Sequence, residues 1–168
     1  MLFCRGEDHR GGEFPLIRIL FVCHGNICRS PMAEFVMKDR VRRAGCEEKF
    51  LIASAATTTD DLGSDMYPMA KEELRKHGIP FEPRQARQLR HGEYRYWDYI
   101  VVMDGENLAD IPDLLGPDTE HKVWLLLSFA GEKRDVSDPW YTRDFAAAYG
   151  DISLGCEALL KEIMKVSV

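Results

Sequence analysis

Residues 16–31 read LIRILFVCHGNICRSP, and this stretch decides the fold. Its first half, Leu16–Cys23, is β-rich and almost wholly apolar, as expected of a strand that a sheet buries on both faces. The pattern breaks at His24–Arg29, and Ser30-Pro31 then combines an N-cap residue with proline at the first helical position. The sequence therefore predicts a buried strand, a tight loop and a helix that ends near Gly45.

The rest of the chain repeats this alternation. Further strands are expected at Phe50–Ala56, Tyr96–Met103 and Val123–Leu127. Further helices are expected at Pro68–His77, at Glu106–Ile111 with an end at Pro112, and at Asp144–Val166. Strands that alternate with helices form right-handed βαβ units, so we expect an α/β fold with a mostly parallel sheet covered on both faces. We expect one domain over residues 17–168, preceded by a loose, flexible tail over residues 1–16.

Composition and charge argue against several classes of protein. Hydrophobic residues make up 45% of the 168-residue chain and charged residues 30%, as in an ordinary globular domain. The net charge of −6 argues against binding to nucleic acid or to an anionic membrane surface. No apolar stretch is long enough to span a bilayer, and the N-terminus lacks the apolar core of a secretory signal, so a cytoplasmic location is expected. The cysteines lack zinc-ligand spacing, and we expect neither a metal nor a cofactor.

The loop between the first strand and its helix has the residues of an anion site. Its successive backbone N–H groups can converge on one point at a helix N-terminus. Gly25 allows close approach of the backbone, Asn26 tolerates the left-handed region, and the planar fork of Arg29 can hold two phosphate oxygens. The positive field of the loop favours the thiolate form of Cys23, to which Ser30 can donate a hydrogen bond. We interpret Cys23 as a nucleophile rather than as an inert thiol at the end of a strand.

The sequence resembles the low-molecular-weight protein tyrosine phosphatases over nearly all of the chain beyond the tail. The loop CHGNICRSP, residues 23–31, looks like the family signature almost letter for letter. Further matches are Ser54-Ala55-Ala56-Thr57, His77-Gly78-Ile79, Ala86-Arg87-Gln88-Leu89, Met103-Asp104 and Asp138-Pro139. The resemblance implies a three-layer, flavodoxin-like fold around a four-stranded parallel sheet with the strand order 2-1-3-4.

The resemblance also implies a mechanism. Cys23 attacks phosphorus to give a cysteinyl-phosphate that water hydrolyses, Arg29 holds the equatorial oxygens, and Asp138 acts first as general acid and then as general base. The expected substrate is a phosphotyrosine-containing protein or a small aryl phosphate, and phosphate or sulfate can occupy the loop. The other residues expected at the site are the phosphate-binding residues His24, Gly25, Asn26, Ile27, Cys28 and Ser30, the loop support Ser54, and the rim residues Asp60, Trp140 and Tyr141.

Two positions affect the expected substrate choice and redox behaviour. Asp60, followed by Asp61, stands where the family often places an aromatic wall, and an acidic wall is expected to favour basic peptides over dianionic ones. Cys28 can pair with Cys23 under oxidation and so protect it, or it can simply be a small buried residue.

Three alternative functions remain. An arsenate reductase of the same fold needs two further cysteines near the third strand, and residues 78–104 contain none. A protein arginine phosphatase carries Thr where this chain has Ile27, whose side chain offers no hydroxyl to a guanidinium. A non-catalytic phosphate-binding regulator would lack the nucleophile, the arginine or the acid, and the chain has all of them.

Overall fold

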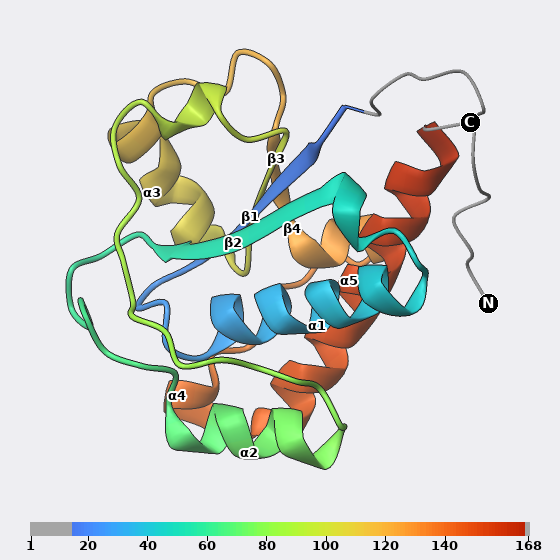
Figure 1. Ribbon diagram of the computed structural model, residues 1–168. Coiled ribbons are helices and arrows are strands. Elements are labelled where there is room, and N and C mark those ends of the chain that lie inside the picture. Colours follow the sequence, from blue (N-terminus) through green and yellow to red (C-terminus); the bar gives the residue numbers. More distant parts are fainter. Residues whose placement is uncertain (1–14, 167–168) are drawn as a thin grey trace.

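The computed structural model describes residues 15–166, and Figure 1 shows how its helices and strands are arranged. Most of the expected tail, residues 1–14, lies outside the described residues, as do residues 167–168. None of the helices within residues 15–166 combines the length and the apolar character that a bilayer span requires.

A parallel sheet of four strands forms the centre of the fold, in the order β2-β1-β3-β4. Strand β1 (Ile17–Cys23) pairs with β2 (Phe50–Ala56) on one side and with β3 (Tyr99–Val102) on the other. Strand β4 (Val123–Leu125) pairs with the outer edge of β3. Residues 19–22 of β1 are fully buried, which explains the continuous apolar run of this central strand. The expected α/β fold and strand order are confirmed.

Helices cover both faces of the sheet, so the fold has three layers (Figure 1). Helices α1 (Arg29–Arg43) and α5 (Phe145–Val166) pack on one face, and α2 (Pro68–Lys76) packs against both of them. Helix α3 (Gly105–Leu115) covers the opposite face. Successive side chains of a strand point to opposite sides, and those of β1 accordingly contribute to both hydrophobic cores.

One predicted helix end is wrong. Helix α3 passes through Pro112 and continues to Leu115, whereas the sequence predicted that it would stop at the proline. Proline removes one helix hydrogen bond, but its fixed φ suits a helix. Ile111 and Leu115, on either side of it, are buried against the sheet, and this packing outweighs the lost bond.

Two strands are shorter than predicted. Strand β3 begins at Tyr99 rather than Tyr96, because a 3-10 helix at Glu93–Arg95 precedes it. Strand β4 ends at Leu125, because the apolar residues that follow form a 3-10 helix, Leu126–Ala130, which packs against α5. Short apolar runs of this kind suit a strand or a buried helical turn equally well, so periodicity alone does not separate them.

The fold brings two strand ends and two helix starts to one edge. Strand β1 leads through its loop into α1, and β3 leads through Asp104 into α3. Ligands of open α/β sheets bind at this carboxyl edge, outside the ends of the parallel strands. The functional site is therefore expected at this edge.

We predict that Gly155→Ala lowers the free energy of unfolding by about 1–3 kcal/mol. A Cβ on Gly155 would lie 2.4 Å from Cγ of Leu126, a fully buried residue against which α5 packs. Gly150→Ala is the matched control in the same helix, because a Cβ there meets no atom within 4 Å. This control should raise the free energy of unfolding by about 0.5–1 kcal/mol. Urea denaturation measures both, and destabilisation by both variants would contradict the close approach at Gly155.

Candidate active site

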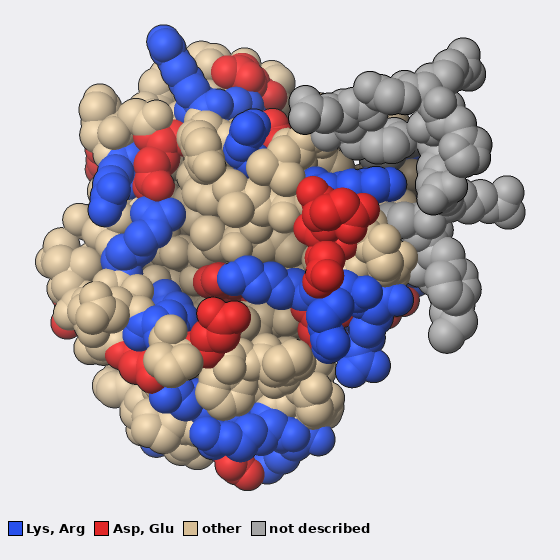
Figure 2. All heavy atoms as spheres, viewed as in Figure 1, with Lys and Arg blue, Asp and Glu red and all other residues tan. Residues whose placement is uncertain are grey.

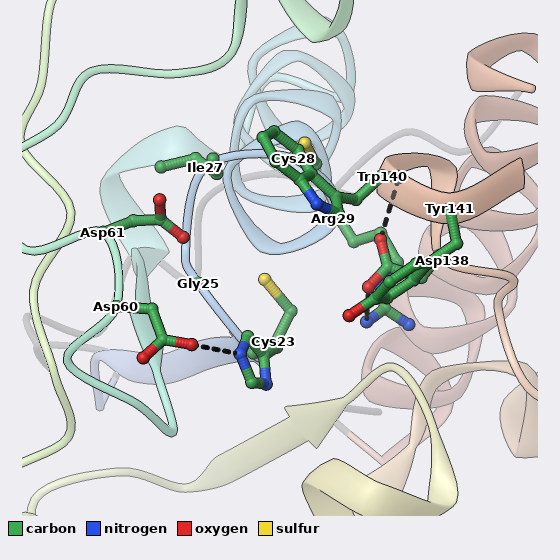
Figure 3. A pocket seen from close by; sticks show the side chains of 11 residues that line it. Cys23, Gly25, Ile27, Cys28, Arg29, Asp60, Asp61, Asp138, Trp140 and Tyr141 are labelled. Atoms are coloured by element: carbon green, nitrogen blue, oxygen red, sulfur yellow. Dashed lines mark hydrogen bonds and ion pairs between the residues drawn. The ribbon is translucent and has the colours of Figure 1, made fainter. Parts of the chain in front are cut away.

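The loop after β1 borders a cavity of about 200 Å³ at the carboxyl edge of the sheet (Figure 3). Asn26 has a φ of 59°, in the left-handed region, and its N–H points back at Cys23 Sγ from 3.3 Å. Gly25 leaves room for the Asp61 carboxylate, because a Cβ there would lie 2.3 Å from Asp61 Oδ2 and the carboxylate would have to move. The cavity is lined by Cys23, His24, Gly25, Ile27, Cys28, Arg29, Asp60, Asp61, Asp138, Trp140 and Tyr141.

Asn26 is fully buried beneath the loop, and its side-chain amide is held on both sides. Its Nδ2 donates to Ser30 Oγ at 2.8 Å and to Ser54 Oγ at 2.9 Å, so Ser54 supports the loop as expected. Its Oδ1 accepts from the guanidinium of Arg84 and, at 3.2 Å, from the N–H of Arg87. Because a buried amide is stable only when it is hydrogen-bonded, these partners stabilise the left-handed turn.

Arg29 lies on the other side of the cavity with only 2% of its side chain exposed. Its Nη1 donates to Asp104 Oδ2 at 2.7 Å and to the Val136 carbonyl at 2.9 Å, and its Nη2 donates to Asp138 Oδ2 at 3.2 Å. Burial by itself would lower the pKa of Arg29, but the negative charges of Cys23, Asp138 and Asp104 raise it above its ordinary value. The cavity therefore contains a permanently positive, planar group that can hold two oxygens of an anion.

Two free thiols line the cavity, and their surroundings differ. Cys23 Sγ lies 3.0 Å from Ser30 Oγ and accepts from the N–H of Asn26. Burial raises the pKa of Cys28 far above its usual value, and the charge of Cys23 raises it further. Since the thiolate is the reactive form of cysteine, Cys23 rather than Cys28 is the candidate nucleophile.

Asp138 reaches the cavity from a segment far along the chain. It caps α4 (Pro139–Thr142), a short helix that the sequence analysis did not predict: Asp138 Oδ1 accepts from the N–H of Trp140 at 3.0 Å. Its other oxygen, Oδ2, faces Arg29. The Asp138-Pro139 match therefore marks a helix start that directs a carboxylate into the cavity.

The mouth of the cavity has two unlike walls. Trp140 and Tyr141 form one wall, 47% and 79% exposed, and the Trp140 ring packs edge-on against Tyr67 at 5.2 Å between centroids. Figure 3 shows Asp60 and Asp61 on the side of Cys23 opposite to Asp138 and Tyr141. Asp60 Oδ2 pairs with Nε2 of His24 at 2.7 Å. One wall is therefore aromatic and the other carries carboxylates.

The structure brings every predicted site residue to this cavity or to the loop beneath it. Sequence reasoning missed three residues that hold the loop: Glu34, Arg84 and Asp104. Glu34 Oε2 accepts from Ser54 Oγ at 2.5 Å, and Asp104 both binds Arg29 and caps α3 through the N–H of Asn107 at 2.7 Å. Met103-Asp104 was a motif match without an assigned role, whereas Arg84 gave no local signal, because a charged residue in a loop is usually solvated.

Comparisons with known proteins identify the family to which the chain is similar. A family model described as low molecular weight phosphotyrosine protein phosphatase matches residues 18–167. Low molecular weight protein-tyrosine-phosphatase YfkJ of Bacillus subtilis is 37% identical over 152 residues, which cover 89% of this chain and 97% of the relative. Low molecular weight protein-tyrosine-phosphatase PtpA of Staphylococcus aureus is 33% identical over 151 residues, which cover 89% of this chain and 96% of the relative.

Solved structures give the same result. The crystal structure of YfkJ from Bacillus subtilis aligns with a TM-score of 0.87 at 36% identity, covering 95% of this chain and 99% of that chain. The crystal structure of a Drosophila arginine phosphatase aligns with a TM-score of 0.80 at 30% identity, covering 88% of this chain and 98% of that chain.

We predict that iodoacetate alkylates Cys23 of the folded protein at neutral pH and leaves Cys28 and Cys156 unmodified. Burial raises the pKa of Cys28, and it raises the pKa of Cys156 to about 12, so neither supplies a thiolate. Peptide mass spectrometry after timed quenching measures the three sites. Inorganic phosphate should slow the reaction of Cys23, and unfolding in urea should expose all three thiols. Equal alkylation of Cys23 and Cys28 in the folded protein would contradict the assignment.

Proposed function

Because the chain belongs to the low molecular weight phosphotyrosine protein phosphatase family, we propose that it hydrolyses phosphotyrosine in proteins and small aryl phosphates with Cys23 as nucleophile. One observation carries the residue roles. Cys23, Arg29 and Asp138 line the same cavity, although Asp138 comes from a distant segment of the chain. A nucleophile, an anion-binding guanidinium and an acid within one cavity are the groups that phosphate ester hydrolysis needs.

In the first step Cys23 Sγ attacks phosphorus, and the sulfur–phosphorus bond forms as the bond to the aryl oxygen breaks. The loop N–H groups and Arg29 stabilise the charge on the remaining phosphate oxygens. Asp138, as the carboxylic acid, gives its proton to the leaving aryl oxygen. Arg29 has to exchange Asp138 Oδ2 for a phosphate oxygen, so binding of the substrate also frees the carboxyl group.

In the second step water attacks the phosphorus of the cysteinyl-phosphate. Asp138, now a carboxylate, takes a proton from this water. The sulfur–phosphorus bond breaks, inorganic phosphate forms and Cys23 leaves as the thiolate. Ser30 Oγ lies 3.0 Å from Cys23 Sγ and is placed to donate to the departing thiolate.

A protein arginine phosphatase is the alternative with some support from observation. The carboxylates of Asp60 and Asp61 line the cavity and can attract the guanidinium of a phosphoarginine, and one structural relative is described as an arginine phosphatase. Ile27 also lines the cavity and is apolar, which favours an aromatic ring over a guanidinium. Release of phosphate from a phosphoarginine peptide and from a phosphotyrosine peptide of otherwise equal sequence separates the two functions.

We predict that Asp138→Ala lowers kcat/KM, which reports the steps up to formation of the cysteinyl-phosphate, by about 10²–10³-fold for phenyl phosphate and by less than about tenfold for p-nitrophenyl phosphate, because in the first step only the poor leaving group needs the proton. Cys23→Ser should abolish hydrolysis of both substrates, with no burst of phenol release and no trapped phosphoenzyme. Asp113→Ala, at an exposed carboxylate of α3, is the matched control and should leave both rates unchanged. Equal losses on the two substrates would show that Asp138 is not the acid.

We predict that the acidic wall selects basic substrates. With phosphotyrosine peptides that differ only in flanking residues, kcat/KM should be several-fold higher for Lys than for Glu, and Asp60→Asn should reduce this preference about two- to threefold, since an exposed charge contributes modestly. Added salt should weaken the preference in the wild-type protein. Asp110→Asn, at another exposed position on α3, is the control that should not change it. If Asp60→Asn left the preference for Lys over Glu unchanged, the acidic wall would not determine substrate selection.

A further inference from the structure

Arg84 lies directly beneath the anion-binding loop and outside the residues that line its cavity. Its Nη1 donates to the backbone carbonyl of Asn26 at 2.7 Å, and its Nη2 contacts Asn26 Oδ1. The backbone N–H of Arg84 donates to Asp65 Oδ1 at 3.3 Å, and Asp65 is itself paired with Lys71 at 2.6 Å. Arg84 is therefore held in place and binds both oxygens of the residue at the turn of the loop.

These contacts fix which way the Asn26 amide points. The guanidinium of Arg84 and the N–H of Arg87 can only donate, so the oxygen of the amide has to face them. The nitrogen of the amide then has to face the hydroxyls of Ser30 and Ser54, to which it can only donate. Either hydroxyl therefore accepts from Asn26 and keeps its own hydrogen for another partner.

The hydroxyl groups of Ser30 and Ser54 donate their hydrogens to different acceptors. Ser54 Oγ donates to Glu34 Oε2 at 2.5 Å. Ser30 Oγ has two acceptors within reach, Cys23 Sγ at 3.0 Å and the Ala55 carbonyl at 3.4 Å. A thiolate is charged, whereas the contact to the carbonyl is long, so the Ser30 hydroxyl donates to Cys23 when this residue is ionised.

We propose that Arg84 is a positioning residue that acts through Asn26 to direct the Ser30 hydroxyl toward the Cys23 thiolate. The proposal rests on the proposed function, in which Cys23 is first the nucleophile and then the leaving group. With a reversed amide, Asn26 would present its oxygen to Ser30. The serine hydroxyl would then donate to Asn26, and the thiolate would lose a donor in both steps of the reaction.

The charge of Arg84 also acts on the thiolate. Burial lowers the pKa of Arg84, and the negative charges of Glu34 and Cys23 oppose this shift. Since the attraction is mutual, Arg84 stabilises the Cys23 thiolate directly as well. The direct effect of the Arg84 charge does not depend on Ser30, whereas the effect through the Asn26 amide requires the Ser30 hydroxyl. Removal of this hydroxyl therefore distinguishes the two effects.

The test is the rate at which iodoacetate alkylates Cys23 at neutral pH in the wild-type protein, Arg84→Gln, Ser30→Ala and the double variant. Arg90→Gln is the matched control, because Arg90 is an exposed arginine of the same segment. Alkylation reports the thiolate without any phosphate ester, so a failure of this proposal is distinguishable from a failure of the proposed phosphatase activity. Thermal unfolding of each variant identifies loss of the fold.

We expect Arg84→Gln to slow alkylation about tenfold, the effect of losing a charged hydrogen bond to a buried group, and Arg90→Gln to change it less than about twofold. In a protein that already carries Ser30→Ala, Arg84→Gln should slow alkylation by much less than tenfold, because only the direct effect of the charge remains and two residues that act through one pathway are not additive. Fully additive losses would overturn the proposal in favour of direct charge or general loosening, and a wild-type rate in Arg84→Gln would overturn any role of Arg84.

Arg84→Lys replaces Arg84→Gln in the same measurement if the latter does not fold. Lysine retains the charge, but its single ammonium group cannot bridge the two oxygens of Asn26 as the guanidinium does. Alkylation should then slow at least about twofold, since one hydrogen bond of the pair is lost. A rate equal to that of the wild-type protein would overturn the proposal.

Discussion

A guanidinium that is almost wholly buried is the constraint on which the site depends. Arg29 has 2% of its side chain exposed, and a buried charge without partners would destabilise the protein by several kcal/mol. Asp104, the Val136 carbonyl and Asp138 supply those partners. They come from the start of α3 and from the segment that leads into α4, so compensation of one charge fixes both segments against the loop after β1. The same compensation places Asp138 on the cavity that Cys23 lines.

The polar groups of the site form two sets, one buried below the cavity and one exposed at its mouth, and substitutions in the two sets should have different effects. Below the cavity, Arg84 and the N–H of Arg87 donate to Asn26, which donates to the two serines. At the mouth, Asp60 and Asp61 stand across the cavity from Trp140 and Tyr141 (Figure 3). Hydrogen bonds among buried groups are strong and specific, whereas exposed charges are screened by water and salt. Substitutions in the buried set should therefore alter the chemistry of the thiol, and those at the mouth the choice of substrate.

The sequence predicted the strands, a mostly parallel sheet and the loop, because these carry strong local signals in continuous segments, whereas the order of the strands came only from the resemblance. It placed Asp138 only through the resemblance, since no spacing relates this residue to Cys23. The end of α3 was wrong because packing of Ile111 and Leu115 outweighs the local effect of Pro112. Arg84 was missed because its partner lies far away in the sequence. Figure 2 shows Lys and Arg spread over one face of the molecule. Nothing in the local sequence distinguishes an arginine that binds a buried asparagine from an arginine that is exposed to solvent.

Arg29 donates to Asp138, and a phosphate group at the loop competes for the same guanidinium. An anion held by both arms of the guanidinium would have to displace this carboxylate from Arg29. The residue proposed as the catalytic acid is therefore also a competitor for the group proposed to bind the phosphate.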